Sequence, residues 1–512
     1  MNPFASILRN WSILGGAQVL ASLAAMVFMV IVSRGLGDVE FGRLYLAFTL
    51  ASIVAVLGDA GLSQVLTRAV ARDHASLAAY LARSALLIAA LAAALYAILV
   101  GAARALGFTP EVNALVLVLG VLIVTESLGQ LLAGAFQAHE RMMVPALARV
   151  GSNVVTLAVV IPLLLVWPSA LAVAGVLVLG SALRVAIQGL SVGGLEGFRL
   201  APAPPPPWRG LLRAGVPFLA VQGLGVFVVR IDVVMLGRLA SEAAVGWYGA
   251  ASRAVEALYV VPIMLTSATF PVLSRLWSEG PGIFATTLRK TLNVVLVISV
   301  PVAVTLFVLA QDIVSFLFTL AAFAPAVPIL RIQAVTVPLV FVDYLLVCAL
   351  MAIGRERTWL AIVVGACFLD PALDWVLIGA ADAAYGNGGI GAALATMLTE
   401  VFLFACVLRA LPSGVLDASS LRVAARVAVV GSLQGAALVT ARVAGVPWLA
   451  AAVLAGCVYV LAVIRLRLLP SDLVSWLGEL IERRAPRLVP GRMPTGADVA
   501  ATPAKPPSAD AA

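Results

Sequence analysis

The chain has 512 residues, of which 62% are hydrophobic and only 11% are charged, and its mean hydropathy is +1.09. Hydrophobic runs of about 20 residues recur along almost the whole chain, and a helix of that length crosses the ~30 Å hydrocarbon core of a bilayer. No soluble domain buries so many apolar segments in one core. The composition therefore excludes a soluble enzyme or binding module and predicts an all-α, polytopic membrane protein.

We expect about 14 transmembrane helices joined by short connections. The first run is too long, and too poorly matched to a small-residue cleavage site, to be a removable signal peptide, so it is predicted to remain as the first span. In chain order the predicted spans cover residues 10–33, 44–67, 80–103, 113–137, 144–167, 169–192, 211–236, 244–272, 287–309, 326–353, 359–380, 389–411, 421–443 and 447–467.

The formal net charge is +8, but its distribution argues against a nucleic-acid partner. If the N-terminus is cytoplasmic, most of the 33 Lys and Arg residues fall in loops on the cytoplasmic side. This is the bias expected of membrane proteins with short loops. With an even number of spans, both termini are then predicted to be cytoplasmic, in a bacterial inner membrane.

The sharpest change in composition is APAPPPPW, Ala201 to Trp208, where successive prolines cannot continue a helix and favour a stiff linker. After Pro470 comes an amphipathic stretch and then a Pro-, Ala- and Gly-rich tail that we expect to be disordered. The predicted segments are an N-terminal six-helix lobe, a cytoplasmic linker, a C-terminal six-helix lobe, two additional transmembrane helices, and the cytoplasmic amphipathic segment with its tail: residues 1–200, 201–210, 211–412, 413–470 and 471–512.

The two lobes show signs of an internal repeat. Four residues of the first lobe recur at one constant offset in the second: Gln18, Arg34, Gly42 and Ala47 match Gln222, Arg238, Gly246 and Ala251. Six spans in each lobe give both lobes the same orientation, related by an axis along the membrane normal. A binding site is then expected between the lobes.

Several blocks of the sequence resemble a known family. They are NWSILGGAQVLASLAAMVFMVIVSRGLGDVEFGRLYLAF, LGDAGLSQVLTR, FQAHERM, VRIDVVMLGRLASEAAVGWYGAASR, FPVLSR and GNGGIGAALATMLTE. Together they are similar to bacterial polysaccharide (oligosaccharide-lipid) flippases of the multidrug/oligosaccharidyl-lipid/polysaccharide exporter superfamily. In that family the stretch before GNGGIGAAL usually carries asparagines, whereas here it reads LDPALDW, with Asp370 and Asp374.

The resemblance implies two six-helix lobes, alternating access, and flipping of undecaprenyl-diphosphate-linked sugars. The implied partners are a lipid-diphosphate-linked glycan, membrane lipid, and polysaccharide polymerase or assembly proteins. No cofactor is implied.

Arginines inside the predicted spans are the candidates for binding an anionic substrate. A charged residue at the centre of a span costs ~2.5–3.5 kcal/mol by insertion scales, so it usually faces a cavity or a partner. A guanidinium group stays charged and grips phosphate oxygens in pairs. The alternatives are salt bridges between helices, or side chains that reach the headgroups. The substrate-binding candidates are Arg34, Arg184, Arg230 and Arg253.

Carboxylates inside the spans are candidates for coupling transport to H⁺ or Na⁺. The alternative for each is a hydrogen-bonded or helix-pairing group. The candidates are Asp59, Glu126, Asp232, Glu256 and Asp343, and Asp370, Asp374 and Glu400 are further carboxylates inside the spans with the same two interpretations. No metal site is predicted, because the four cysteines have no metal-ligand spacing and the two histidines are isolated in the sequence.

No catalytic constellation or nucleotide-binding lysine motif is present in the sequence, so an enzyme is not expected. The prediction is a transporter that flips a lipid-diphosphate-linked oligosaccharide. One alternative is a cation-coupled multidrug exporter of the same superfamily, which would favour an apolar, acidic cavity. Another is a membrane glycosyltransferase or sugar ligase, whose outer site would need longer loops than those predicted. The arginines favour the anionic substrate.

Overall fold

The computed structural model describes residues 3–469 except 196–197, 199–205, 413 and 415–416. Most of the predicted proline linker and the whole predicted segment 471–512 lie outside the described residues. No strand occurs among the residues described, and nearly all of them are helical. The predicted all-α membrane architecture is therefore confirmed.

The first half of the chain forms seven α-helices and a short 3₁₀ helix, η1 (His74–Ser76). The α-helices are α1 (Pro3–Asp59), α2 (Leu62–Arg72), α3 (Leu77–Ala105), α4 (Pro110–Leu119), α5 (Val121–Ala138), α6 (Met143–Val166) and α7 (Ala170–Val192).

The second half begins with a long helix and contains a second short 3₁₀ helix, η2 (Ala257–Tyr259). Its α-helices are α8 (Trp208–Leu239), α9 (Glu242–Glu256), α10 (Val260–Glu279), α11 (Pro281–Val308), α12 (Ala310–Leu317), α13 (Leu320–Phe323), α14 (Ala326–Ala352), α15 (Glu356–Tyr385), α16 (Gly388–Ala410), α17 (Ala418–Val443) and α18 (Trp448–Arg465).

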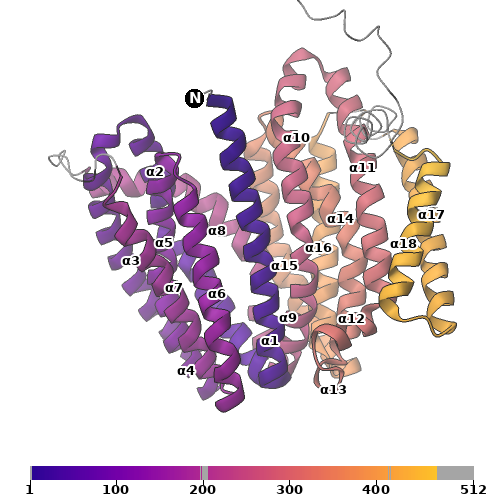
Figure 1. Cartoon of the computed structure of the whole chain (residues 1–512), viewed down its shortest axis with the longest axis horizontal. Helices are drawn as coiled ribbons and strands as arrows, with labels where there is room; N and C mark the ends of the chain where they lie inside the picture. Colours follow the sequence, from indigo (N-terminus) through magenta and orange to yellow (C-terminus); the bar gives the residue numbers. More distant parts are fainter. Residues whose placement is uncertain (1–2, 196–197, 199–205, 413, 415–416, 470–512) are drawn as a thin grey trace, which may run out of the picture.

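In the described part of the chain, 13 helices are long and apolar enough to cross a membrane. They match the predicted spans one for one, except that the first two spans are joined in α1. A straight helix of 57 residues would be ~85 Å long, far more than a bilayer needs. Gly37, at φ 78°, breaks it, and the chain turns back at this point (Figure 1). This φ lies in the left-handed region, which glycine adopts readily because it has no Cβ atom, and this explains why position 37 is a glycine. With this turn, the predicted number of spans is confirmed.

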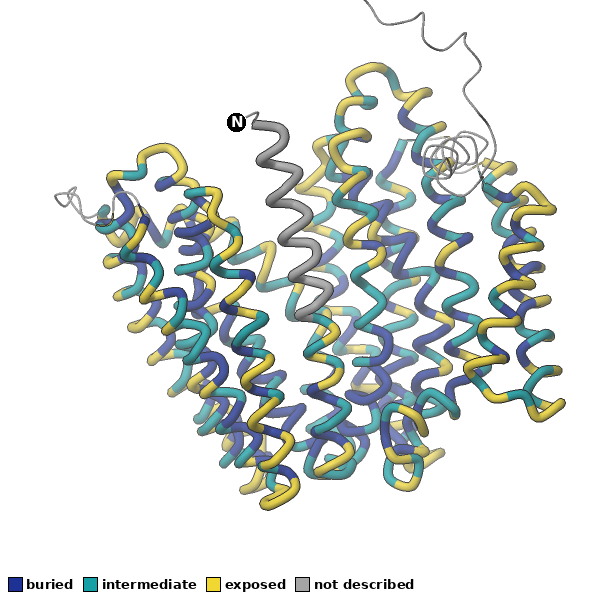
Figure 2. The backbone as a smooth tube through the Cα atoms, viewed as in Figure 1, coloured by how far each residue is buried: buried dark blue, intermediate teal, exposed yellow. Residues whose placement is uncertain are grey.

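Figure 1 shows two groups of helices, with α2–α7 on one side, α9–α16 on the other, and α17 and α18 at the outer edge of the second group. Helix α1 packs against α5 and α6 of the first group and against α8 and α9, and α17 and α18 pack on each other and on α11. We call α1–α7 the N-lobe and α8–α16 the C-lobe. Large apolar side chains such as Leu165, Val166 and Leu190 are exposed, as expected for a surface that faces lipid. Figure 2 shows that exposed stretches recur along the outer helices of both groups.

The lobes meet most closely at the residues that define the sequence repeat. A Cβ atom on Gly42 would collide with the carbonyl oxygen of Glu242, and one on Gly246 would collide with the carbonyl oxygen of Asp38. Asp38 and Glu242 are related by the same offset as Gly42 and Gly246. Exchanging the repeats therefore converts one contact into the other, as in a two-fold symmetric interface. This geometry supports the repeat, while the exact domain boundaries stay a prediction.

The two ends of the bundle differ. At one end, which we call the linker face, α8 begins at Trp208 and α10 ends at Glu279. At the opposite end, which we call the closed face, α1 turns at Gly37 and α9 begins at Glu242. The two lobes converge at the closed face (Figure 1).

Candidate functional site

The first polar cavity lies in the N-lobe, and we call it the N-lobe cavity. It consists of two adjoining spaces, of about 190 and 380 Å³, that share Glu126, Asn153 and Arg184 in their walls. Its walls come mainly from α1, α5, α6 and α7. Polar residues one turn apart on the same helix, such as Glu126 and Gln130 or Arg149 and Asn153, face it together, because residues four apart lie on one side of a helix.

The N-lobe cavity is more basic than acidic. Its walls contain three arginines, Arg149, Arg184 and Arg253, and two carboxylates, Asp59 and Glu126. Arg184 pairs with Glu126 at 2.6 Å, and the Ser181 hydroxyl donates to the same carboxylate at 2.9 Å. Asp59 accepts hydrogen bonds from Ser63 of α2.

Arg253 reaches the N-lobe cavity from α9, a helix of the C-lobe. The Nε atoms of Arg184 and Arg253 are buried and have no hydrogen-bond partner in the described residues. Such unpartnered donors are costly unless a ligand meets them. Two predicted substrate arginines from different lobes are thus brought to one cavity, with donor capacity remaining.

Arg230 and Arg253 share one carboxylate. Their guanidinium groups contact Glu256 at 3.0 and 2.9 Å, respectively. Arg230 also donates to the Tyr45 hydroxyl at 3.3 Å, and the Arg253 guanidinium lies 5.2 Å from the centre of the Tyr45 ring. The predicted i, i+3 pair of Arg253 and Glu256 is present. Because two cations share one anion, the salt-bridge interpretation accounts for only part of their charge.

A second, smaller cavity of about 150 Å³ lies in the C-lobe, and we call it the C-lobe cavity. Its polarity is opposite to that of the N-lobe cavity. One arginine, Arg230, and four carboxylates line it: Asp232, Glu256, Asp370 and Glu400. Glu256 lies between the two cavities, because it pairs with Arg230 of this one and Arg253 of the other.

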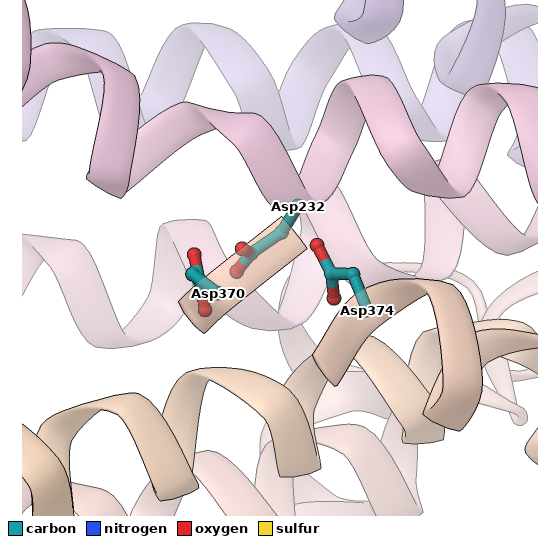
Figure 3. A group of neighbouring side chains, drawn as sticks. All are labelled: Asp232, Asp370 and Asp374. Carbon is teal, nitrogen blue, oxygen red and sulfur yellow. The ribbon is translucent and has the colours of Figure 1, made fainter. Parts of the chain in front are cut away.

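Three carboxyl groups meet next to the C-lobe cavity, and we call them the aspartate triad: Asp232, Asp370 and Asp374. One oxygen from each lies within 4.8 Å of the others, and all three residues are buried. Asp232 comes from α8, whereas Asp370 and Asp374 lie one turn apart on α15. Figure 3 shows the three side chains gathered at the crossing of these helices.

Hydroxyl groups satisfy only part of the triad. Asp232 accepts from Tyr248 and Thr396, both at 2.6 Å, and Asp370 accepts from Thr399 at 2.6 Å. Both Asp374 oxygens and one Asp232 oxygen are buried with no hydrogen-bond partner in the described chain. Three ionised carboxylates this close repel one another, so the site suits a hard cation or protons.

Asp232, Asp370 and Asp374 are all among the carboxylates inside the predicted spans, but the sequence did not predict that the three meet. The spacing of four residues between Asp370 and Asp374 in an apolar span was the available signal, since it places both on one helix face. Asp343 on α14 lies beside Glu400 on α16, and both oxygens of Asp343 are buried with no hydroxyl or N–H donor in the described chain. The expectation that the chain has no metal site stays untested.

The structure places Arg34 apart from the other substrate-binding candidates. It does not line either cavity. Its guanidinium donates to the carbonyl oxygens of Leu317, at 2.9 Å, and of Phe316. These carbonyls end α12, and an arginine there satisfies groups that have no partner within the helix. Arg34 therefore lies at the end of α12, away from both cavities, and its role in substrate binding stays a prediction.

Polar contacts that the sequence did not predict join the lobes at the closed face. Arg43 pairs with Glu242 of the C-lobe and with Glu40 at 2.6 Å. The Thr109 hydroxyl donates to Glu242 at 2.5 Å. The Trp247 ring N–H donates to Asp38 at 2.9 Å. These contacts surround the Gly42–Gly246 crossing and hold this end of the bundle together.

A large apolar groove lies on the C-lobe between α11, α14, α16 and α17. Its volume is about 570 Å³, and its walls include Leu292, Val335 and Phe404. Asp417, where α17 begins, is the one charged residue among the described residues of its walls, and it pairs with Arg289. The Ser419 hydroxyl, the Ser420 backbone N–H and Arg289 hold the pKa of Asp417 below its usual range, so this residue is ionised.

Comparisons with known proteins agree with the architecture. A model of the family described as polysaccharide biosynthesis protein matches residues 7–277, and the MatE family model matches residues 217–376. No curated protein sequence is similar enough to count as a match.

Solved structures with the same fold include a lipid II flippase, MurJ, in an inward closed conformation. It has a TM-score of 0.72 and 15% identity, covering 90% of this chain and 98% of that one. An inward-facing multidrug resistance MATE family transporter has a TM-score of 0.64 and 17% identity, covering 76% and 94%. A transporter of the same superfamily from Pyrococcus furiosus has a TM-score of 0.56 and 15% identity, covering 79% and 95%. At these identities the likeness shows the fold.

Proposed function

Because this chain belongs to the polysaccharide biosynthesis protein family, we propose that it flips a lipid-diphosphate-linked oligosaccharide across the bacterial inner membrane by alternating access. The observation that carries the proposal is the basic N-lobe cavity, in which Arg184 and Arg253 meet from different lobes. A diphosphate that leaves water loses hydration, and fixed guanidinium groups replace it.

The charge balance supports an anionic headgroup in this cavity. Arg184 has Glu126 as its partner, whereas Arg230 and Arg253 share Glu256. The arginine pair and Glu256 therefore carry one net positive charge. A diphosphate near Arg253 would meet this positive charge and use the unpartnered Nε donors.

The arrangement of the lobes supports alternating access. The lobes are held together at the closed face by the Gly42–Gly246 crossing and the Arg43–Glu242 pair. We propose that the linker face is cytoplasmic, as the positive-inside rule predicts. The structure then represents the state that receives substrate from the cytoplasm. Reporter fusions at Pro205 and after Arg484 should both report a cytoplasmic location, and a periplasmic signal at either would overturn this orientation.

The apolar groove on the C-lobe suits the prenyl tail. A tail kept in the groove beside α17 stays in an apolar environment, while the sugar passes through the polar cavity.

The aspartate triad and Asp343 are proposed as the coupling site for Na⁺ or H⁺. Arg230 pairs with Glu256 and lines the C-lobe cavity together with Asp232. A cation at the triad therefore alters the ion-pair network that also holds Arg253.

The acidic C-lobe cavity favours the second candidate, a cation-coupled multidrug exporter. Its size argues against this function, because about 150 Å³ is smaller than the ~300–1,000 Å³ of typical drug-sized sites. It is large enough for an inorganic cation with its ligands. The larger cavity is the basic one, which repels organic cations.

A binding experiment separates the two candidates. The purified protein in lipid nanodiscs is titrated with a prenyl-diphosphate oligosaccharide and, separately, with an organic dye cation. We expect the glycolipid to bind, and Arg253→Ala to weaken its binding by about tenfold or more, the value of one charge-assisted contact. Arg275→Ala is the matched control, because Arg275 is exposed and pairs with Glu279 outside the cavities.

Arg184→Lys and Arg230→Lys keep the charge but lose the planar fork, so they should retain part of the binding. Tight binding of the dye with no binding of the glycolipid would reject the flippase proposal and favour the exporter.

A further inference from the structure

A third polar pocket, outside both cavities, lies at the linker face between α2, α3 and the first turns of α8. Its volume is about 320 Å³, and Arg68 and Arg72 line it together with Tyr80 and Phe218. Arg68 and Arg72 are one turn apart on α2, so their guanidinium groups lie on the same side of the helix. Neither the proposed transport path nor the coupling site uses this pocket.

The two arginines have no ion pair with a carboxylate among the residues that the structure describes. Arg68 contacts the Phe218 ring, with its guanidinium carbon 5.2 Å from the ring centre. Asp73 also lines the pocket, but its carboxylate accepts the backbone N–H of Ala75 at 3.1 Å and thereby begins η1. Two arginines and one aspartate leave the pocket with one net positive charge.

The surroundings place the pocket at the boundary between lipid and water. Val221 lies one turn after Phe218 on the same side of α8 and is 57% exposed, so the surface of α8 next to the pocket is apolar. Arg72 and Asp73 end α2 and are exposed. A ligand here meets cations at one end and an apolar helix surface at the other, which fits a molecule with a charged head and acyl chains.

We propose that this pocket binds the phosphodiester headgroup of an anionic phospholipid. A phosphodiester carries one negative charge, which matches the net charge of the pocket, whereas a diphosphate carries more. The two guanidinium groups grip the phosphate oxygens, and the Tyr80 hydroxyl supplies a further donor. The apolar chains of the lipid lie along α8 beside Val221.

The position of the pocket gives the bound lipid a structural effect. Helices α2 and α8 are in close contact here, because a Cβ atom on Gly61 would collide with the carbonyl oxygen of Gly215 and one on Gly215 with that of Ala60. Helix α8 continues to Arg230 and Asp232 at its other end. A headgroup held by Arg68 and Arg72 therefore stabilises the contact of the first half of α8 with the N-lobe.

Native mass spectrometry and thermal unfolding of the delipidated full chain test the proposal. Phosphatidylglycerol and phosphatidylcholine are added separately at equal concentration, with inorganic phosphate as a third arm. We expect phosphatidylglycerol to bind and raise the unfolding temperature, and phosphatidylcholine and phosphate to do neither. The double variant Arg68→Gln, Arg72→Gln should bind phosphatidylglycerol about tenfold more weakly.

The control is Arg422→Gln, Arg426→Gln, which removes the same charge from two exposed residues one turn apart on α17. It should bind like the wild type. Equal loss in both double variants would overturn the proposal in favour of general surface charge, and equal protection by inorganic phosphate would overturn the lipid as occupant. Arg68→Lys, Arg72→Lys tests geometry with charge retained: intermediate binding supports the site, and wild-type binding contradicts the paired grip on phosphate.

Discussion

Replacing Gly42 or Gly246 by alanine should open the closed face. Each new Cβ atom would collide with a backbone carbonyl oxygen of the other lobe, so the crossing must separate or shift. Overpacking of this kind costs about 1–3 kcal/mol, and each 1.4 kcal/mol changes an equilibrium constant about tenfold. The state that is closed at this face should therefore lose about tenfold in population relative to the open state.

The repeat makes this prediction more specific. Because the two collisions are related by exchange of the lobes, Gly42→Ala and Gly246→Ala should act in the same direction and to a similar extent. The control is Gly175→Ala on α7, where a Cβ atom would meet nothing within 4 Å. In that helix alanine should be neutral or slightly stabilising.

Spin labels at Leu106 and Thr319 measure the separation of the lobes at the closed face. Leu106 directly follows α3 of the N-lobe, Thr319 directly precedes α13 of the C-lobe, and both residues are exposed. Pulsed electron paramagnetic resonance on a cysteine-free background should show a longer distance population in both glycine variants and not in the control. A wild-type distribution in both variants, or a change in only one of them, would refute the symmetric crossing as the contact that sets this equilibrium.

Three further predictions concern single side chains. Arg43→Glu should weaken the closed face and increase the labelling of a cysteine that replaces Thr319. Adding Glu242→Arg should restore the wild-type level of labelling, because the ion pair is re-formed with its charges exchanged. Asp374→Asn should raise the Na⁺ or H⁺ concentration needed for half-maximal transport by about tenfold or more, whereas Asp382→Asn on the same helix should leave it unchanged. An unchanged cation dependence in Asp374→Asn would exclude the triad as the coupling site. Arg34→Gln should lower stability by about 1 kcal/mol and leave substrate affinity unchanged, and a selective loss of affinity would support a role for Arg34 in substrate binding.

The sequence predicted those features that depend on local pattern. Apolar runs set the spans, because backbone groups in lipid must be satisfied within a helix. The spacing of Arg253 and Glu256 predicted their pair, because it lies on a single helix. Gly42 and Gly246 were identified as repeat equivalents, but their direct contact depends on how the lobes pack and has no local signal.

Long-range contacts explain what the sequence did not predict. The aspartate triad requires α8 to cross α15, and neither helix alone shows this crossing. Arg34 looked like an intramembrane cation by position, yet the end of α12, far along the chain, supplies its partners. Its repeat equivalent, Arg238, did not indicate this contact. The repeat conserves the position of a residue within its lobe, but not the contacts that the residue makes outside that lobe.

Reconstituted flipping tests the central claim most directly. Proteoliposomes carry a fluorescent prenyl-diphosphate oligosaccharide in both leaflets, and an impermeant reagent destroys the label that is exposed outside. For the wild type, the account predicts loss of nearly all the label, because flipping exposes the inner pool. For Arg253→Ala it predicts loss of only about half, the fraction in the outer leaflet. If Arg253→Ala flips the glycolipid as fast as the wild type and Arg275→Ala, the basic cavity is not the path of the headgroup and the account is contradicted.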